Sequence, residues 1–199
     1  MLFRRRAAAP PPDPVAAQID VGALPAGRRG PVLDALAARH RYGELVAGVP
    51  EGPLRDRLTT MGERVDAGVL AVWKTTEHAQ RIDALMASLD PERATAELKQ
   101  ARRDVDAGHG DPAALATLTE RFASTQRLLN ARVELDRRIP LLEARLATAV
   151  ARAAELTLTS SASTASAGLD TLGGELDALV IELQALQGGV DDVGGRDER

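Results

Sequence analysis

The sequence predicts an all-α protein: an elongated antiparallel helical hairpin or bundle with coiled-coil-like packing and disordered termini. Only 2% of its 199 residues are aromatic, which suits thin helix-on-helix packing better than a sheet-based core. Long stretches repeat apolar residues at alternating spacings of three and four, the period of a helix face. A strong turn signal at residues 108–112 separates two such stretches, so we expect the chain to reverse there.

The longest predicted helix covers residues 112–158, about 70 Å at 1.5 Å per residue. Pro140 lies inside it and cannot donate a hydrogen bond to the carbonyl of Asp136. Because the apolar stripe continues past Pro140, we predict a bent but continuous helix. The stripe consists of Leu115, Leu118, Phe122, Leu128, Leu129, Leu135, Ile139, Leu142, Leu146, Val150 and Leu156.

Residues 53–89 form the predicted partner of this helix. Gly68 removes bulk from the middle of the contact face and predicts a close helix approach there. A third helix, residues 91–106, has a thin apolar face and is expected to run antiparallel to the central helix after the turn. The two heptad positions of residues 53–89 hold Leu58, Val65, Val72, Ala79 and Met86, and Leu54, Met61, Gly68, Thr75, Ile82 and Leu89; the third helix offers Ala94, Leu98, Ala101 and Val105.

A short helix is predicted at residues 31–46, opened by Pro31. We expect it to lie across one end of the longer helices, because a helix of this length is not stable alone. Its expected apolar side consists of Leu33, Leu36, Ala37, His40 and Leu45 or Val46.

Composition divides the chain into five segments. Residues 1–30 are predicted to be a disordered, basic and Pro-rich segment, 31–158 the helical bundle with its long antiparallel hairpin, and 159–168 a Ser/Thr-rich linker. Residues 169–188 form a leucine-heptad helix, and 189–199 a disordered acidic tail. The helix seam consists of Leu169, Leu172, Leu176, Leu179, Leu183 and Leu186. This seam suits folding back onto the central helix, with pairing between chains as the alternative.

The candidates for chemistry are few. Asp104, Asp106, His109 and Asp111 are spaced like the start of a calcium loop, but Gly108 and Leu115 stand where that loop needs oxygen ligands. An acidic helix end followed by an Asp N-cap is the preferred interpretation. The chain has no cysteine, and we found no nucleophile motif, phosphate-binding loop or nucleic-acid face, so no catalytic residue and no cofactor is predicted.

These patterns predict a non-enzymatic helical protein that acts as a structural, adapter or scaffold module through helix faces, with a protein partner or its own copies. Residues 1–50 carry seven arginines against four acids, and residues 151–199 carry three against nine. One alternative is a self-assembling, stress-type protein that touches an anionic membrane surface through Arg4, Arg5 and Arg6. Another is a metal-binding protein that uses the Asp104–Asp111 turn. No run is long and apolar enough for a membrane span, so the expected location is the cytoplasm.

Overall fold

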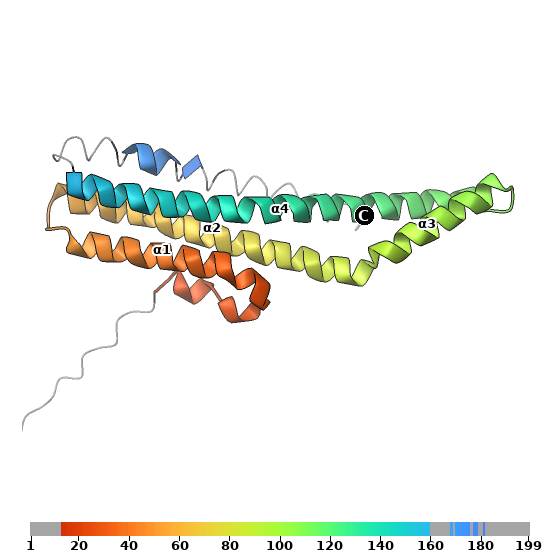
Figure 1. The fold of residues 1–199 in the computed structure, drawn as a ribbon, viewed down its shortest axis with the longest axis horizontal. Coiled ribbons are helices and arrows are strands. Elements are labelled where there is room, and N and C mark those ends of the chain that lie inside the picture. Colours follow the sequence, from red (N-terminus) through yellow and green to blue (C-terminus); the bar gives the residue numbers. More distant parts are fainter. Residues whose placement is uncertain (1–12, 160–167, 169, 176, 179–180, 182–199) are drawn as a thin grey trace, which may run out of the picture.

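The structure is a computed structural model that describes residues 13–159, 168, 170–175, 177–178 and 181. Its long helices are α1 (Arg29–Gly48), α2 (Pro53–Leu89), α3 (Pro91–Asp106) and α4 (Pro112–Thr159). Three short 3-10 turns precede them: η1 (Ala16–Gln18), η2 (Val21–Ala23) and η3 (Ala26–Arg28). The described residues contain no strand, so the predicted all-α class is confirmed, and the helices form an elongated body (Figure 1).

Helix α4 runs without interruption through Pro140, as predicted, and extends along most of the molecule (Figure 1). Every residue of its predicted apolar stripe is buried or half-buried. The most buried part of that stripe lies in the second half of the helix, at Leu135, Ile139, Leu142, Leu146 and Val150. The stripe therefore packs against neighbouring helices over its whole length, and it is most fully buried in the second half of α4.

Helix α2 contacts α4 through the heptad face that the sequence predicts. All positions of that face between Leu58 and Met86 are buried, and only Leu54 and Leu89 at the two ends are half-buried. A Cβ atom placed on Gly68 would lie 3.3 Å from Cδ1 of Leu146, so the predicted close approach of two helices at this glycine is confirmed.

Helix α3 forms an arm with the first part of α4, beyond the end of α2 (Figure 1). Asp90 joins α2 to α3 in the left-handed conformation, with φ of 43°, and its carboxylate caps α3 by accepting from the Arg93 N–H. At the other end the amides of His109 and Gly110 donate to the carbonyl of Asp104, which reverses the chain as predicted. In α3 only Ala94 is fully buried, because the arm is two helices thick.

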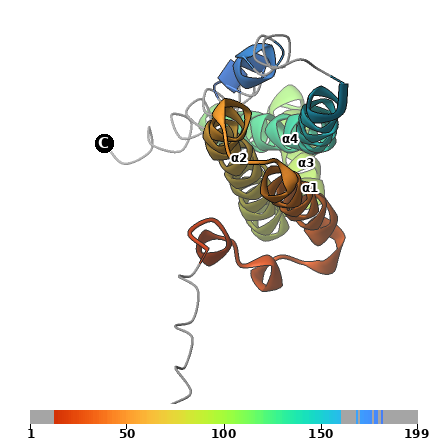
Figure 2. The same cartoon turned by 90° about the vertical axis from the view of Figure 1, so that its left-hand side faces the viewer.

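The prediction for the first helix was wrong in two respects. Helix α1 lies along α2 and α4 instead of across their end (Figure 2), and it buries a different face. Leu33 is 51% exposed, and Ala37 and His40 are exposed as well, while Leu36, Leu45 and Val46 are half-buried. The buried face consists of Val32, Ala35, Ala38 and Tyr42.

The reason lies in the size of the buried side chains of α1. Ala35 and Ala38 are small and buried in the core that α1 shares with α2 and α4, and lengthwise contact buries more apolar surface than a crossing at one end. Tyr42 fits this contact because its hydroxyl donates to the carbonyl of Leu58, at 2.6 Å. The large apolar residues of α1 therefore do not mark its buried face.

The predicted disorder of residues 1–30 was wrong for residues 13–30. Val15 and Leu24 are buried in the core, at 4% and 3% exposure. Aspartates hold the turns locally, since Asp13 accepts from the Val15 N–H and Asp20 from the Ala23 N–H. The Pro-rich composition suggested disorder. Two apolar side chains are nevertheless enough to order the segment, because they pack on a helix surface that is already formed. Residues 1–12, like the acidic tail and the linker at 160–167, lie outside the described residues.

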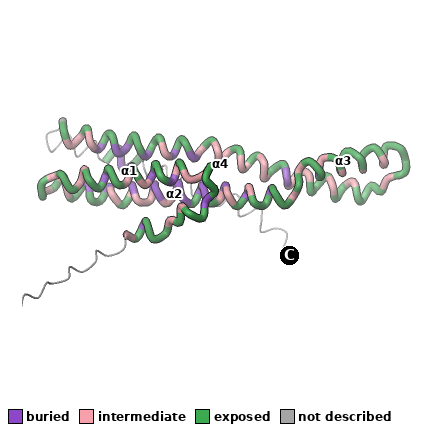
Figure 3. The backbone as a smooth tube through the Cα atoms, turned by 60° about the horizontal axis from the view of Figure 1, so that its bottom comes forward, coloured by how far each residue is buried: buried purple, intermediate pink, exposed green. Residues whose placement is uncertain are grey.

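Burial divides the bundle along its length (Figure 3). The larger core cluster joins α1, α2 and α4 and contains residues such as Leu58, Val65 and Leu146. A smaller cluster of Ala79, Ile82, Met86, Leu135 and Ile139 follows toward the arm. Within the described part of the chain, no helix is long and apolar enough to cross a membrane.

Candidate helix-docking site

The described residues of the C-terminal segment are helical and lie against the bundle. Residues 170–175, with 168, 177–178 and 181, adopt helical conformation, and they are drawn in blue beside α2 and α4 (Figure 2). Leu172 of this segment is only 3% exposed and belongs to the larger core cluster. One leucine of the predicted seam is thus part of the core of its own chain.

Ion pairs flank Leu172 on both sides. Asp177 pairs with Arg64 of α2, with 3.1 Å between Oδ1 and Nε, and Glu175 pairs with Arg152 of α4, with 2.9 Å between Oε2 and Nη1. Asp170 lies 3.7 Å from Arg57 of α2, between Oδ2 and Nη1. All three acids belong to the C-terminal segment and all three arginines belong to the long helices. We call the surface bounded by Arg57, Arg64 and Arg152 the helix-docking groove.

The ion pairs also fix the direction of the docked segment. Asp170 and Asp177 are seven residues apart, as are their partners Arg57 and Arg64, so the segment runs parallel to α2 in heptad register. A Cβ atom placed on Gly168 would meet the side chain of Leu156 near the end of α4, so the segment runs antiparallel to α4. Each of these exposed ion pairs stabilises the protein by up to about 1 kcal/mol. Together they favour one register of the docked helix and an acidic helix over a basic one.

Gly173 gives the groove a second point of contact. A Cβ atom placed on Gly173 would lie 1.8 Å from Nη1 of Arg64, so the guanidinium lies directly against the helix backbone at this position. Any other residue would displace the arginine that also pairs with Asp177. No local sequence pattern identifies Arg64 as the neighbour of this glycine.

The structure does not describe the side chains of the other predicted interaction residues. Leu169, Leu176, Leu179, Leu183 and Leu186 lie outside the residues whose side chains are described, so their part in the seam stays a prediction. Arg4, Arg5 and Arg6 also lie outside the described residues.

The Asp104–Asp111 turn has the structural role of a helix end. The Asp104 carboxylate accepts from Nε2 of Gln100, at 2.7 Å, and Asp111 caps α4 by accepting from the Ala113 N–H, at 2.9 Å. Asp106 and His109 are exposed. Among the described residues, no three His, Cys, Asp or Glu side chains come together in a way that could hold a metal ion.

A charged cluster that the sequence did not predict fastens the N-terminal segment to the bundle. Arg28 of η3 pairs with Asp83 of α2, at 2.5 Å, and with Asp136 of α4, at 2.9 Å, while Arg132 also binds Asp83. Burial raises the pKa of the Asp83 carboxyl, but hydrogen bonds from Arg132 and Arg28 outweigh it, so the pKa lies below its ordinary value. Arg28 and Asp136 are 108 residues apart in the sequence, and no local motif connects the members of this cluster.

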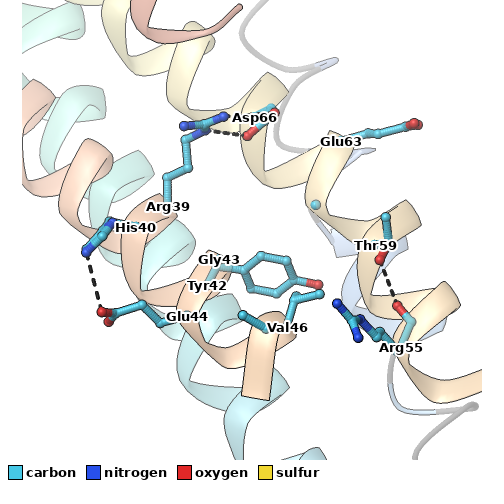
Figure 4. A pocket seen from close by; sticks show the side chains of 12 residues that line it. Arg39, His40, Tyr42, Gly43, Glu44, Val46, Arg55, Thr59, Glu63 and Asp66 are labelled. Atoms are coloured by element: carbon cyan, nitrogen blue, oxygen red, sulfur yellow. Dashed lines mark hydrogen bonds and ion pairs between the residues drawn. The ribbon is translucent and has the colours of Figure 1, made fainter. Parts of the chain in front are cut away.

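A second groove lies between α1 and α2, with a volume of about 660 Å³ (Figure 4). Arg39 and Asp66 pair at one end, and Arg55 lies at the other. The ring of Tyr42 lies between them, and burial raises the pKa of its hydroxyl above the ordinary value. Gly43 of α1 and Gly62 of α2 both line this hollow, which we call the α1/α2 groove.

The chain was compared with protein families, curated proteins and solved structures. No family model matches the chain, and neither the curated proteins nor the solved structures contain a significant match.

Proposed function

We propose that this protein is a non-enzymatic helical adapter or scaffold that binds protein partners through helix faces. The observation that carries the proposal is the docking of Leu172 between two arginine-bearing helices. A groove with a leucine-accepting floor and basic walls favours an amphipathic helix that has leucines on one face and acids beside them. The partner class is therefore an acidic, leucine-striped helix, from another protein or from a second copy of this chain.

The chain's own C-terminal helix occupies the groove and would compete with such a partner. Its tether is short, because Gly168 lies against Leu156, close to the end of α4. A short tether gives the C-terminal helix a high effective concentration at the groove. A helix from another chain must therefore bind more tightly than the C-terminal helix, or bind after that helix has dissociated. We propose the cytoplasm as the compartment, on sequence composition alone.

A peptide-binding experiment tests this function. The full chain carrying Leu172→Asp would be titrated with a fluorescent peptide of residues 168–188, with binding followed by anisotropy. The buried aspartate should expel the resident helix, so the variant should bind the peptide saturably while the wild-type chain binds it much more weakly. Added salt should weaken the binding, because ion pairs line the groove.

A charge-reversal variant provides the matched control. Arg64→Glu in the Leu172→Asp background should lower the peptide affinity, whereas Arg93→Glu, which changes an arginine of α3 in the arm, should leave it unchanged. Circular dichroism would verify that each variant keeps its helix content. Equal and salt-independent binding by every variant, or no binding by any folded variant, would contradict the proposed groove specificity.

A further inference from the structure

We propose that the helix-docking groove selects its partner helix by a glycine placed directly after the buried leucine, so that the partner carries the pattern acid-x-Leu-Gly-x-acid-x-acid. The chain's own C-terminal helix is the first example, with Asp170, Leu172, Gly173, Glu175 and Asp177. This inference rests on the proposed function and adds the sequence by which the partner is recognised. A leucine face with acids beside it would otherwise accept many helices.

Two adjacent glycines of the docked helix have opposite surroundings. Gly173 is buried, and a Cβ atom placed on it would overlap the guanidinium group of Arg64, at 2.8 Å from Cζ. Gly174 is exposed, and a Cβ atom placed there would meet nothing within 4 Å. Glycine is less favourable than alanine inside a helix, and no contact at Gly174 requires it. At Gly173 the groove itself leaves no room for a side chain.

The edge of the docked helix that faces α2 consists of Asp170, Gly173 and Asp177. Their spacings of three and four residues place them on one helix face. The two aspartates pair with Arg57 and Arg64, which are seven residues apart on α2. Gly173 lies between the two acids, so the side chain is missing at the point where Arg64 passes over the helix to reach Asp177.

The two contacts of Arg64 depend on each other. Its guanidinium lies against the backbone at Gly173, and its Nε lies 3.1 Å from Oδ1 of Asp177. The docked helix is held in place by Leu172, the preceding residue, which is buried in the core. A side chain at position 173 would therefore push the guanidinium away. Because an arginine side chain is flexible, we expect the cost to be the Arg64–Asp177 contact, with the groove still able to bind a helix.

The same pattern separates the C-terminal helix from the other leucine-bearing helices of this chain. Leucine followed directly by glycine occurs once in the sequence, at residues 172–173. The apolar faces of α2 and α4 also carry leucines, but a residue other than glycine follows each of them. A groove that requires this glycine would reject the leucine faces that build the bundle, which is the discrimination a docking site needs.

Peptides that differ at the two glycines test the proposal. The full chain carrying Leu172→Asp would be titrated with fluorescent peptides of residues 168–188 that carry Gly173→Ala or Gly174→Ala, with binding followed by anisotropy. Both changes raise helix propensity equally, so the difference between them isolates the contact with Arg64. Gly174→Ala should tighten binding about fivefold relative to the unmodified peptide, and Gly173→Ala should bind on the order of tenfold more weakly than Gly174→Ala.

Arg64→Ala in the Leu172→Asp chain provides the matched control. Without the guanidinium, the two alanine peptides should bind with equal affinity. Equal binding of both peptides by the chain that keeps Arg64 would overturn the glycine requirement and leave the proposed function standing. A difference that persists after Arg64→Ala would overturn it too, because the glycine would then serve another contact.

Hydrogen exchange in the full chain tests the same contact without a peptide. With the C-terminal helix in place, the protection of amides at residues 171–175 should be on the order of tenfold lower in Gly173→Ala than in Gly174→Ala. Adding Arg64→Ala should make the two variants equal. If no peptide binds, the proposed function fails, and this comparison still decides whether the groove requires glycine. Equal protection in the two variants that keep Arg64 would overturn the inference.

Discussion

Gly68 of α2 packs directly against Leu146 of α4, with 3.3 Å between a Cβ atom placed on the glycine and Cδ1 of the leucine. Leu146 is fully buried, so its side chain has little room to retreat. Glycine at this position sets the distance between the two longest helices.

Gly68→Leu should therefore destabilise the protein. Overpacking of a close helix contact costs about 1 to 3 kcal/mol, more than the better helix propensity of leucine returns. Gly43→Ala is the matched control, since its added methyl group meets nothing within 4 Å and should stabilise the chain by up to about 1 kcal/mol. Urea unfolding at neutral pH measures both. A more stable Gly68→Leu variant would mean that α2 and α4 separate freely.

Leu172→Ala should lower the free energy of unfolding by about 2 to 3 kcal/mol, because it removes a buried leucine from the core. Leu158→Ala, at a position that is 85% exposed, should change it by less than about 0.5 kcal/mol. Thermal and urea unfolding of the full-length variants provide the comparison. Equal small effects would show that the C-terminal segment contributes no core residue.

Acid should weaken the charged cluster around Asp83. The pKa of this carboxyl is lower in the folded chain than the ordinary value of 3.8, so its contribution is present above the unfolded-state pKa and is lost as the pH falls through the folded pKa. Asp83→Asn should cost about 1 kcal/mol at pH 7 and progressively less below about pH 4. Asp106→Asn, on the exposed surface of α3, should show no such pH dependence. The measurement is urea unfolding of both variants across this pH range.

The arm should open more readily than the rest of the bundle. Helix α3 has one fully buried residue, Ala94, whereas α2 buries residues along most of its length. Hydrogen exchange of amides in α3 should therefore be on the order of 10 to 100 times faster than in residues 61–82 of α2. Uniform protection in both helices would indicate that the arm is covered in solution.

Long, regular patterns were the part of the fold that sequence could predict. The faces of α2 and α4 repeat apolar residues over many turns, so one ambiguous position, such as Gly68, does not change the assignment. Helix α1 is short and rich in alanine, and its larger residues Leu33 and Leu36 misled the choice of face because Ala35 and Ala38 pack more closely. The residues around Val15 and Leu24 carry too few apolar side chains to predict order without knowing the surface that receives them.

Only part of the candidate docking site could be predicted from the sequence. Leucine spacing predicted a seam that includes Leu172 and favoured the central helix as its cover, with pairing between chains as the alternative. It did not predict the ion pairs of the C-terminal segment with α2. Arg57, Arg64 and Arg152 form the edges of the groove only because α2 and α4 lie side by side, and no sequence pattern connects these three arginines. The carboxylates of Asp104 and Asp111 accept hydrogen bonds within α3 and α4, from Gln100 and from the Ala113 N–H.

We expect the C-terminal helix to close the bundle of its own chain in solution, as the burial of Leu172 indicates. Light scattering after size exclusion, applied to the intact chain and to a chain ending at Gly168, tests it most directly. The intact protein should have the mass of one 199-residue chain, and truncation should expose apolar surface that binds a fluorescent dye. An intact chain that is oligomeric and becomes monomeric on truncation would contradict it, because the leucine helix would then join different chains.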